Sequence, residues 1–190
     1  MKKLITILAL LLIPTLTFAQ EYTTVSHTGH GEVLDILRNG KVIYSIVPKY
    51  KKEIIKGDWA GKTSLVHPAY HYLIDRSRAV NPRPKAFDDI TGDGLPNFVC
   101  YERVEWFGNS AAPGAIRVFS ISEDKVEELG SILAEFGEVM YFADFNKDGT
   151  FEFVATDQEN LFSYDEKGLP ISDRAWIFDR KTKRYYQGAL

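Results

Sequence analysis

The stretch Asp144-Phe145-Asn146-Lys147-Asp148-Gly149-Thr150-Phe151-Glu152 decides how the rest of the sequence is interpreted. Side chains that carry oxygen stand at every second position, and a glycine follows the third of them. The earlier stretch 89–97 has the same layout, with Gly94 in the place of the glycine. A hard cation such as Ca²⁺ takes about six to eight oxygen ligands in a flexible shell. Both stretches therefore predict turns in which side-chain oxygens and one backbone carbonyl surround a cation.

The two turns belong to a longer repeat, in which residues 87–102 align with residues 142–157 at an offset of 55, from position 89 to position 144. The leading phenylalanine, both aspartates, the glycine and the trailing Phe-Val are identical, and both segments end on an acid. Self-similarity at such a period indicates stacked supersecondary units. A third, degenerate copy at Asp35, Asn39 and Gly40 is an alternative to a plain hairpin there. We favour the hairpin, because Asn-Gly between two β-rich runs is the strongest short-range hairpin signal.

The remaining sequence predicts short strands. The expected strands are a hairpin over 32–46, then 98–101, 115–121, 139–142, 151–154, 161–164, 175–179 and a return through 184–186. Residues 126–136 and 64–78 fit either a helix or a strand, and residues 20–30 favour an irregular start. We expect a mainly β fold of two to three propeller-blade-like antiparallel units with calcium-binding turns. A closed propeller usually needs about four or more four-stranded blades, so a full single-chain propeller is not expected.

The loop pattern distinguishes between families of calcium-binding proteins. An EF-hand is excluded, because its loop needs a glutamate at position 12 and flanking helices, whereas Cys100 and Ala155 hold that position and strands are expected on both sides. The pattern Asp-x-Asn/Thr-x-Asp-Gly-x-x-Glu/Asn-Phe-Val instead resembles the FG-GAP/VCBS-type repeat. In that family each copy is a small β-sheet unit with a Ca²⁺ loop, as in the propeller blades of integrin α-subunits. The resemblance covers residues 87–102 and 142–157, and the chain is also similar to small exported bacterial proteins of this repeat class.

The resemblance implies two sets of metal ligands. In the second loop they are Asp144, Asn146, Asp148, the Thr150 carbonyl and Glu152, and in the first loop Asp89, Thr91, Asp93, the Leu95 carbonyl and Asn97. The first loop has threonine at its third position and an uncharged asparagine at its ninth, so it offers two formal negative charges against three. Because ligand charge tunes calcium affinity, we expect tighter binding in the second loop and weak binding or none in the first. The alternative for each loop is a turn whose side chains cap its own backbone.

The first residues indicate export. Two lysines, an apolar run over residues 4–12 and small residues before Gln20 form a signal peptide over residues 1–19. Residues 20–190 are then expected to form a single β domain of 171 residues in the periplasm or outside the cell, with no membrane span after signal cleavage. Loss of the two lysines changes the formal charge from −3 to −5, which argues against nucleic acid as a partner. Cys100 is the only cysteine, so an intramolecular disulfide is excluded.

These observations favour an exported calcium-binding β-repeat domain with a binding or scaffolding role toward a protein or glycan partner outside the cytoplasm. The alternative is a secreted hydrolase or enzyme inhibitor with a site near His67 and His71, which are spaced as ligands on one helix face would be. No nucleophile elbow and no phosphate-binding glycine loop occurs in the sequence. Glu102 and Glu105, beside Trp106, are three apart on an expected strand and so face opposite ways, which argues against a catalytic pair. A third possibility is that the loops are purely structural.

Overall fold

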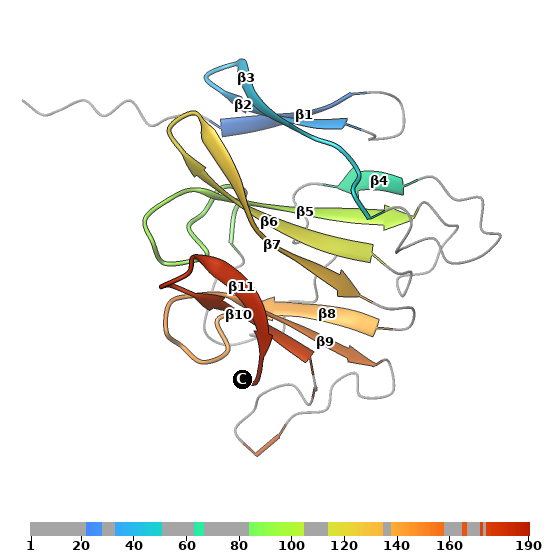
Figure 1. Ribbon diagram of the computed structural model, residues 1–190, viewed down its shortest axis with the longest axis vertical. Helices are drawn as coiled ribbons and strands as arrows, with labels where there is room; N and C mark the ends of the chain where they lie inside the picture. Colours follow the sequence, from blue (N-terminus) through green and yellow to red (C-terminus); the bar gives the residue numbers. More distant parts are fainter. Residues whose placement is uncertain are drawn as a thin grey trace, which may run out of the picture.

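A computed structural model of the chain describes residues 22–27, 33–50, 63–66, 84–104, 114–134, 138–157, 165–166, 172 and 174–190. These residues form eleven strands and no helix, arranged in three antiparallel sheets that are stacked along the long axis (Figure 1). The strands are β1 (Tyr22–His27), β2 (Val33–Arg38), β3 (Lys41–Ile46), β4 (Thr63–Val66), β5 (Asn97–Val104), β6 (Gly114–Ser122), β7 (Lys125–Ala134), β8 (Glu138–Ala143), β9 (Glu152–Asp157), β10 (Arg174–Asp179) and β11 (Arg184–Gly188). The prediction of a mainly β fold built from partial, blade-like units is confirmed.

Two of the three sheets have the same topology. The central sheet has the strand order β4-β5-β6-β7 and the C-terminal sheet the order β8-β9-β10-β11, whereas the N-terminal sheet has three strands in the order β1-β2-β3. Neighbouring strands are antiparallel throughout. The first loop, residues 89–97, leads into β5, and the second loop, residues 144–152, leads into β9. The two similar sequence segments therefore occupy equivalent places, at the entry to the second strand of a four-stranded sheet.

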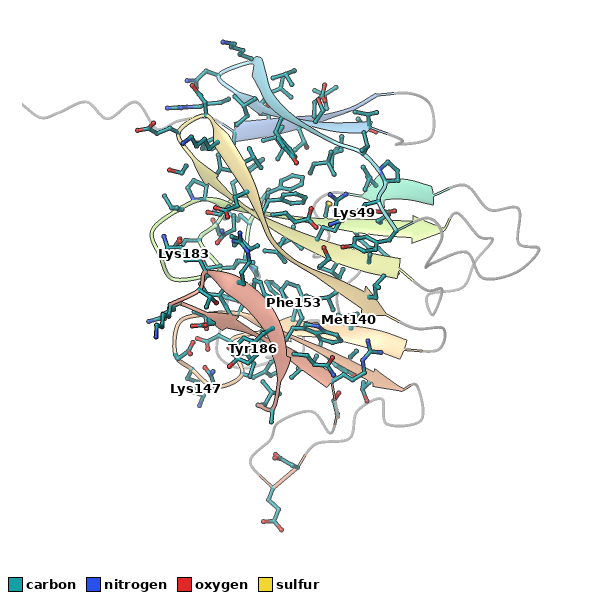
Figure 2. All side chains as sticks on the ribbon, in the orientation of Figure 1. Lys49, Met140, Lys147, Phe153, Lys183 and Tyr186 are labelled. Carbon is teal, nitrogen blue, oxygen red and sulfur yellow. The ribbon has the colours of Figure 1, made fainter. Side chains whose placement is uncertain are left out.

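The central sheet is covered on both faces. Along β5, Phe98 and Cys100 pack toward the N-terminal sheet, and Val99 between them packs toward the C-terminal sheet. This alternation follows from the period of two in a strand. β6 is buried over its first eight residues, which explains its apolar sequence. Phe153 of β9 and Met140 of β8 belong to the core between the central and C-terminal sheets (Figure 2).

The turn between β2 and β3 is a plain hairpin. Asn39 and Gly40 have φ values of 51° and 77°, as the common two-residue hairpin turn requires. Asp35 lies inside β2, where its carboxylate accepts a hydrogen bond from the Ser45 hydroxyl at 2.6 Å. The interpretation of Asp35, Asn39 and Gly40 as a third loop is therefore wrong, because its first ligand position lies in a paired strand.

Two other segments differ from the sequence-based expectation or resolve it. Residues 22–27 form β1 and pair with β2 along their whole length, so the expected irregular start is wrong. In the ambiguous segment 126–136, the residues up to Ala134 belong to strand β7. Gly130, which did not decide between helix and strand in the sequence, packs against β11. A Cβ atom at this position would be 2.9 Å from the Cβ of Tyr185. Segments 1–19 and 161–164 lie outside the described residues.

Candidate metal centre

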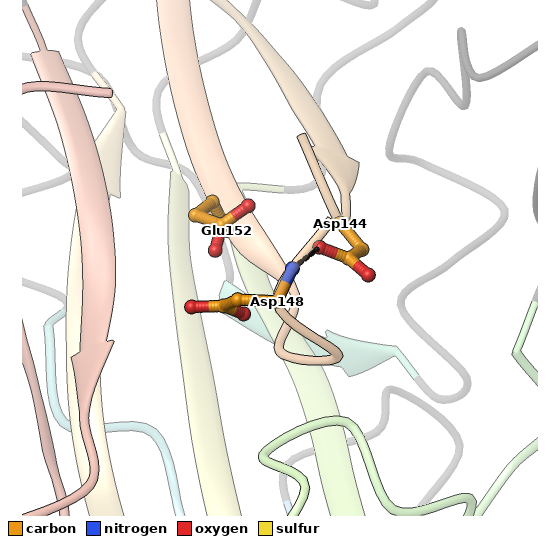
Figure 3. Close-up of side chains that lie close together, drawn as sticks. All are labelled: Asp144, Asp148 and Glu152. Carbon is orange, nitrogen blue, oxygen red and sulfur yellow. Dashed lines mark hydrogen bonds between the residues drawn. The ribbon is translucent and has the colours of Figure 1, made fainter. Parts of the chain in front are cut away.

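The second loop brings three carboxylates together between β8 and β9. Asp144, Asp148 and Glu152 each contribute one carboxylate oxygen, and these three atoms lie within 4.8 Å of one another (Figure 3). Glu152, the first residue of β9, is fully buried, Asp144 is half-buried and Asp148 is exposed. One side of the cluster is therefore open to solvent, and its base is closed by a buried acid.

Backbone hydrogen bonds to the side chains hold the second loop in this shape. The Asp144 carboxylate accepts the N–H groups of Asp148 at 3.0 Å and Gly149 at 3.1 Å. The Asn146 side-chain oxygen accepts the same Asp148 N–H at 2.9 Å. Gly149, with a φ of 86°, allows the turn that returns the chain to β9. The loop thus curls around its own carboxylates and directs them inward.

Burial and mutual repulsion raise the pKa of Glu152 to about 7. Loss of water contact is the largest cause, the charges of Asp148 and Asp144 act in the same direction, and the Phe145 N–H, at 2.8 Å, opposes them. Burial also raises the pKa of Asp148, but hydrogen bonds from Thr150 outweigh this effect and hold that pKa below its ordinary value. A cation among the three carboxylates would stabilise the charged form of each of them.

The first loop has the same outline but satisfies its polar groups differently. Asp89 accepts the N–H groups of Gly92 at 2.8 Å and Gly94 at 2.7 Å. The buried Thr91 hydroxyl oxygen lies between three acceptors, Asp89 Oδ1 at 3.3 Å, Asp93 Oδ1 at 3.1 Å and Asn97 Oδ1 at 3.2 Å. A hydroxyl therefore stands where the side-chain oxygens of this loop converge.

Asn97 takes the place in the first loop that Glu152 has in the second, and both are fully buried. Its side-chain oxygen accepts the Ile90 N–H at 2.8 Å, and its amide nitrogen donates to the Phe119 carbonyl at 3.4 Å. A neutral amide at this position has protein partners for both its donor and its acceptor. The expectation of weaker cation binding in the first loop stays a prediction.

The structure also gives neighbours of the loops that the sequence did not predict. The turn between β10 and β11 lies over both loops: Arg180 donates to the Asp148 carbonyl at 2.8 Å, and the Lys183 ammonium is 3.8 Å from Asp93 Oδ2. The basic composition of residues 180–184 indicates contact with acidic groups, but it does not indicate which acidic residues lie beside this turn. The ligand roles of the Leu95 and Thr150 carbonyls stay predictions.

Glu102, the acid at the end of the first repeat segment, has a structural role. It is fully buried, and its carboxylate accepts the N–H groups of Lys49 at 2.9 Å and Tyr50 at 2.7 Å. Arg117 donates to the Val47 carbonyl at 2.8 Å. These contacts fasten the chain that leaves β3 onto the central sheet, so Glu102 is engaged in connecting two sheets.

The other candidates from the sequence are less informative. Burial raises the pKa of Cys100 to about 12, as expected for a core thiol. His67 and His71, with Glu105 and Trp106, lie outside the described residues, so the alternative site near the histidines stays a prediction.

Comparison of the chain with protein-family models, with curated proteins and with solved structures finds no match. The likeness to FG-GAP/VCBS-type repeats thus depends on the two loop segments alone. No helix in the described part of the chain is long and apolar enough to cross a membrane.

Proposed function

We propose that this protein is an exported calcium-binding β-sheet domain whose second loop, residues 144–152, binds Ca²⁺ and thereby stabilises a surface for a protein or glycan partner outside the cytoplasm. One observation carries the proposal: Asp144, Asp148 and the fully buried Glu152 present oxygens within 4.8 Å of one another. A buried carboxylate beside two further negative charges is unfavourable unless it binds a cation or takes up a proton.

The donor set supports calcium over softer metals. The candidate ligands are carboxylate oxygens, the Asn146 side-chain oxygen and the Thr150 carbonyl, with no histidine or cysteine among them. Oxygen ligands of this kind suit hard cations, whereas imidazole and thiolate ligands suit zinc and copper. Mg²⁺ requires near-ideal octahedral geometry and keeps several waters. A loop with many oxygens in a flexible arrangement therefore favours Ca²⁺.

Export supports the same proposal. A signal peptide over residues 1–19 would deliver the domain to a compartment outside the cytoplasm. Extracellular calcium-binding modules bind Ca²⁺ with dissociation constants of about 10⁻⁴–10⁻³ M, and we expect a site with three carboxylates to reach this range. Because the cation binds the folded loop, it would stabilise the entry to β9, an inner strand of the C-terminal sheet.

A comparison of the two loops tests the proposal. The chain from residue 20 is stripped of metal with chelator, and thermal unfolding is followed while Ca²⁺ or Mg²⁺ is added to the wild type, Asp148→Asn and Asp93→Asn. The two substitutions remove equivalent charges from the second and first loops. We expect Ca²⁺ to raise the midpoint of the wild type and of Asp93→Asn, with Mg²⁺ much weaker, and Asp148→Asn to lose most of the rise. Absence of any shift at millimolar Ca²⁺, or a shift that survives in Asp148→Asn, would contradict calcium binding in the second loop.

A further inference from the structure

The two acidic loops are in direct contact, although 55 residues separate equivalent positions in the sequence. The Phe151 N–H of the second loop donates to the Ile90 carbonyl of the first at 2.9 Å. Phe151 stands between Thr150, the predicted carbonyl ligand, and the buried Glu152. This hydrogen bond therefore fixes the backbone of the second loop at the point where two of its candidate ligands lie.

A guanidinium group occupies the space between the loops. Arg180 donates a hydrogen bond from one terminal nitrogen to the Asp148 carbonyl at 2.8 Å. The same nitrogen is 3.1 Å from the place that a Cβ atom would take on Gly92, and 3.8 Å from the corresponding place on Gly149. The bond to the carbonyl sets the orientation of the peptide between Asp148 and Gly149. That orientation in turn directs the part of the loop from which the Asp148 carboxylate projects.

The absence of a side chain at Gly92 makes this arrangement possible. Besides the Arg180 nitrogen, a Cβ atom there would meet the Gly149 carbonyl oxygen at 3.2 Å, a closer approach than most real Cβ contacts. Gly94 differs in one respect: its φ of 83° is also in the left-handed region, like the 67° of Gly92, but a Cβ atom there would meet nothing within 4 Å. An alanine at residue 94 therefore adds only the strain of the backbone conformation, whereas an alanine at residue 92 also adds contact with the second loop.

We propose that Arg180 and the backbone of residues 90–92 are positioning groups for the cation of the second loop, so that both loops respond to one cation as a coupled unit. The first loop makes room for Arg180 and holds Phe151, and these two residues fix the chain on either side of Thr150. Coupling of this kind is reciprocal: a cation that stabilises the second loop also stabilises its contacts with the first. The inference rests on the proposed function, because it concerns the same cation.

Gly92→Ala is the decisive substitution. Removal of Arg180 would change both the local charge and the contact, whereas the Cβ atom of Gly92→Ala would press on the guanidinium and on the Gly149 carbonyl and leave every charge in place. Calcium binding is measured by titration calorimetry on the wild type, Gly92→Ala and Gly94→Ala. We expect the dissociation constant of Gly94→Ala to stay within about twofold of the wild type and that of Gly92→Ala to rise about tenfold, or about 1.4 kcal/mol. Arg180→Lys keeps the charge without the fork of donors, and we expect it to weaken binding in the same direction.

Amide exchange in the first loop gives a second readout that a purely structural role would not move. The N–H groups of Gly92 and Gly94 both donate to Asp89 and report on the order of that loop. We expect Ca²⁺ to slow their exchange in the wild type and to leave it unchanged in Asp148→Asn. Slowing that persists in Asp148→Asn would mean that the first loop binds Ca²⁺ itself, and would overturn the coupling.

The outcomes separate the two proposals. If the wild type binds no Ca²⁺, the proposed function is wrong and the inference falls with it. If the wild type binds Ca²⁺ but Gly92→Ala and Gly94→Ala have equal dissociation constants, the proposed function stands and the coupling alone is wrong. If Gly92→Ala fails to fold, Arg180→Lys decides: an unchanged dissociation constant in that variant also overturns the coupling.

Discussion

Replacement of Glu152 by glutamine is predicted to have opposite effects on stability with and without calcium. The side chain is fully buried, and its charge lies within 4.8 Å of carboxylate oxygens of Asp144 and Asp148. Glutamine has nearly the same shape and keeps an oxygen that can accept the Phe145 N–H, which now donates to Glu152 at 2.8 Å. The substitution therefore removes the charge and leaves the packing and this hydrogen bond in place.

The magnitude follows from the spacing of the charges. Two unit charges 4.8 Å apart interact by about 3 kcal/mol at an effective dielectric constant of about 20. Asp148 is exposed, so water reduces this repulsion, and we expect removal of one charge to stabilise the metal-free protein by about 1–2 kcal/mol. For a chain of this size that raises the unfolding midpoint by about 2–8 °C. Calcium at about one hundred times its dissociation constant would stabilise the wild type by about 2.7 kcal/mol, a gain that the variant loses.

The assay is differential scanning calorimetry in chelator and in millimolar Ca²⁺, at a pH above the raised pKa of Glu152 so that its carboxyl is ionised. We expect Glu152→Gln to unfold at a higher temperature than the wild type in chelator, and at a lower temperature in calcium. Glu166→Gln, which neutralises an exposed acid elsewhere, is the matched control and should follow the wild type in both conditions. A variant less stable than the wild type in chelator, or an equal calcium shift in both proteins, would refute the reasoning.

Three further predictions concern other parts of the chain. Burial raises the pKa of Glu128, but hydrogen bonds from Arg117 and Ser131 outweigh this effect and hold the pKa below its ordinary value of 4.5. Glu128→Gln should therefore be less stable than the wild type near pH 7. Denaturation at stepwise lower pH should show this difference in stability shrinking below about pH 4. Gly130→Ala places a Cβ atom 2.9 Å from a side-chain carbon of β11, and urea denaturation should show a loss of about 1–3 kcal/mol. If residues 1–19 act as the proposed signal peptide, expression of residues 1–190 should yield a chain outside the cytoplasm that begins at Gln20, as checked by intact-mass spectrometry.

Much of the fold was predictable because its signals are local. The Asn39-Gly40 turn fixes a hairpin through the conformations of two adjacent residues. The glycines and aspartates of the loops likewise determine short turns before β5 and β9. The strand expected over residues 115–121 is present as β6, and its largely apolar sequence is compatible with the burial on both faces that the structure adds.

The rest depends on contacts between distant segments. Gly130 is compatible with a strand because β11 packs on it. The sequence around residue 130 does not indicate that Tyr185 will lie against it. The irregular start was wrongly predicted for residues 22–27 because a polar strand at a sheet edge has little hydrophobic pattern. Contact of Arg180 with the second loop requires the β10–β11 turn to reach back to a loop 32 residues earlier, from 148 to 180. Only the stacking of whole sheets determines such contacts.

The two loops differ most at the residue that begins the strand after each loop. At Asn97 a neutral amide accepts from Ile90 and donates to the Phe119 carbonyl, so the buried position is satisfied entirely by the protein. At Glu152 the same buried position carries a carboxylate, which has no donor to offer a carbonyl and whose negative charge adds to those of its two neighbours. Hydrogen bonds from the Phe145 N–H and the Thr150 hydroxyl satisfy its oxygens in part, but they do not neutralise the charge. The protein alone therefore satisfies the buried position in the central sheet, whereas in the C-terminal sheet the buried carboxyl needs a proton or a cation. This difference is the physical reason for assigning the proposed calcium ion to the second loop.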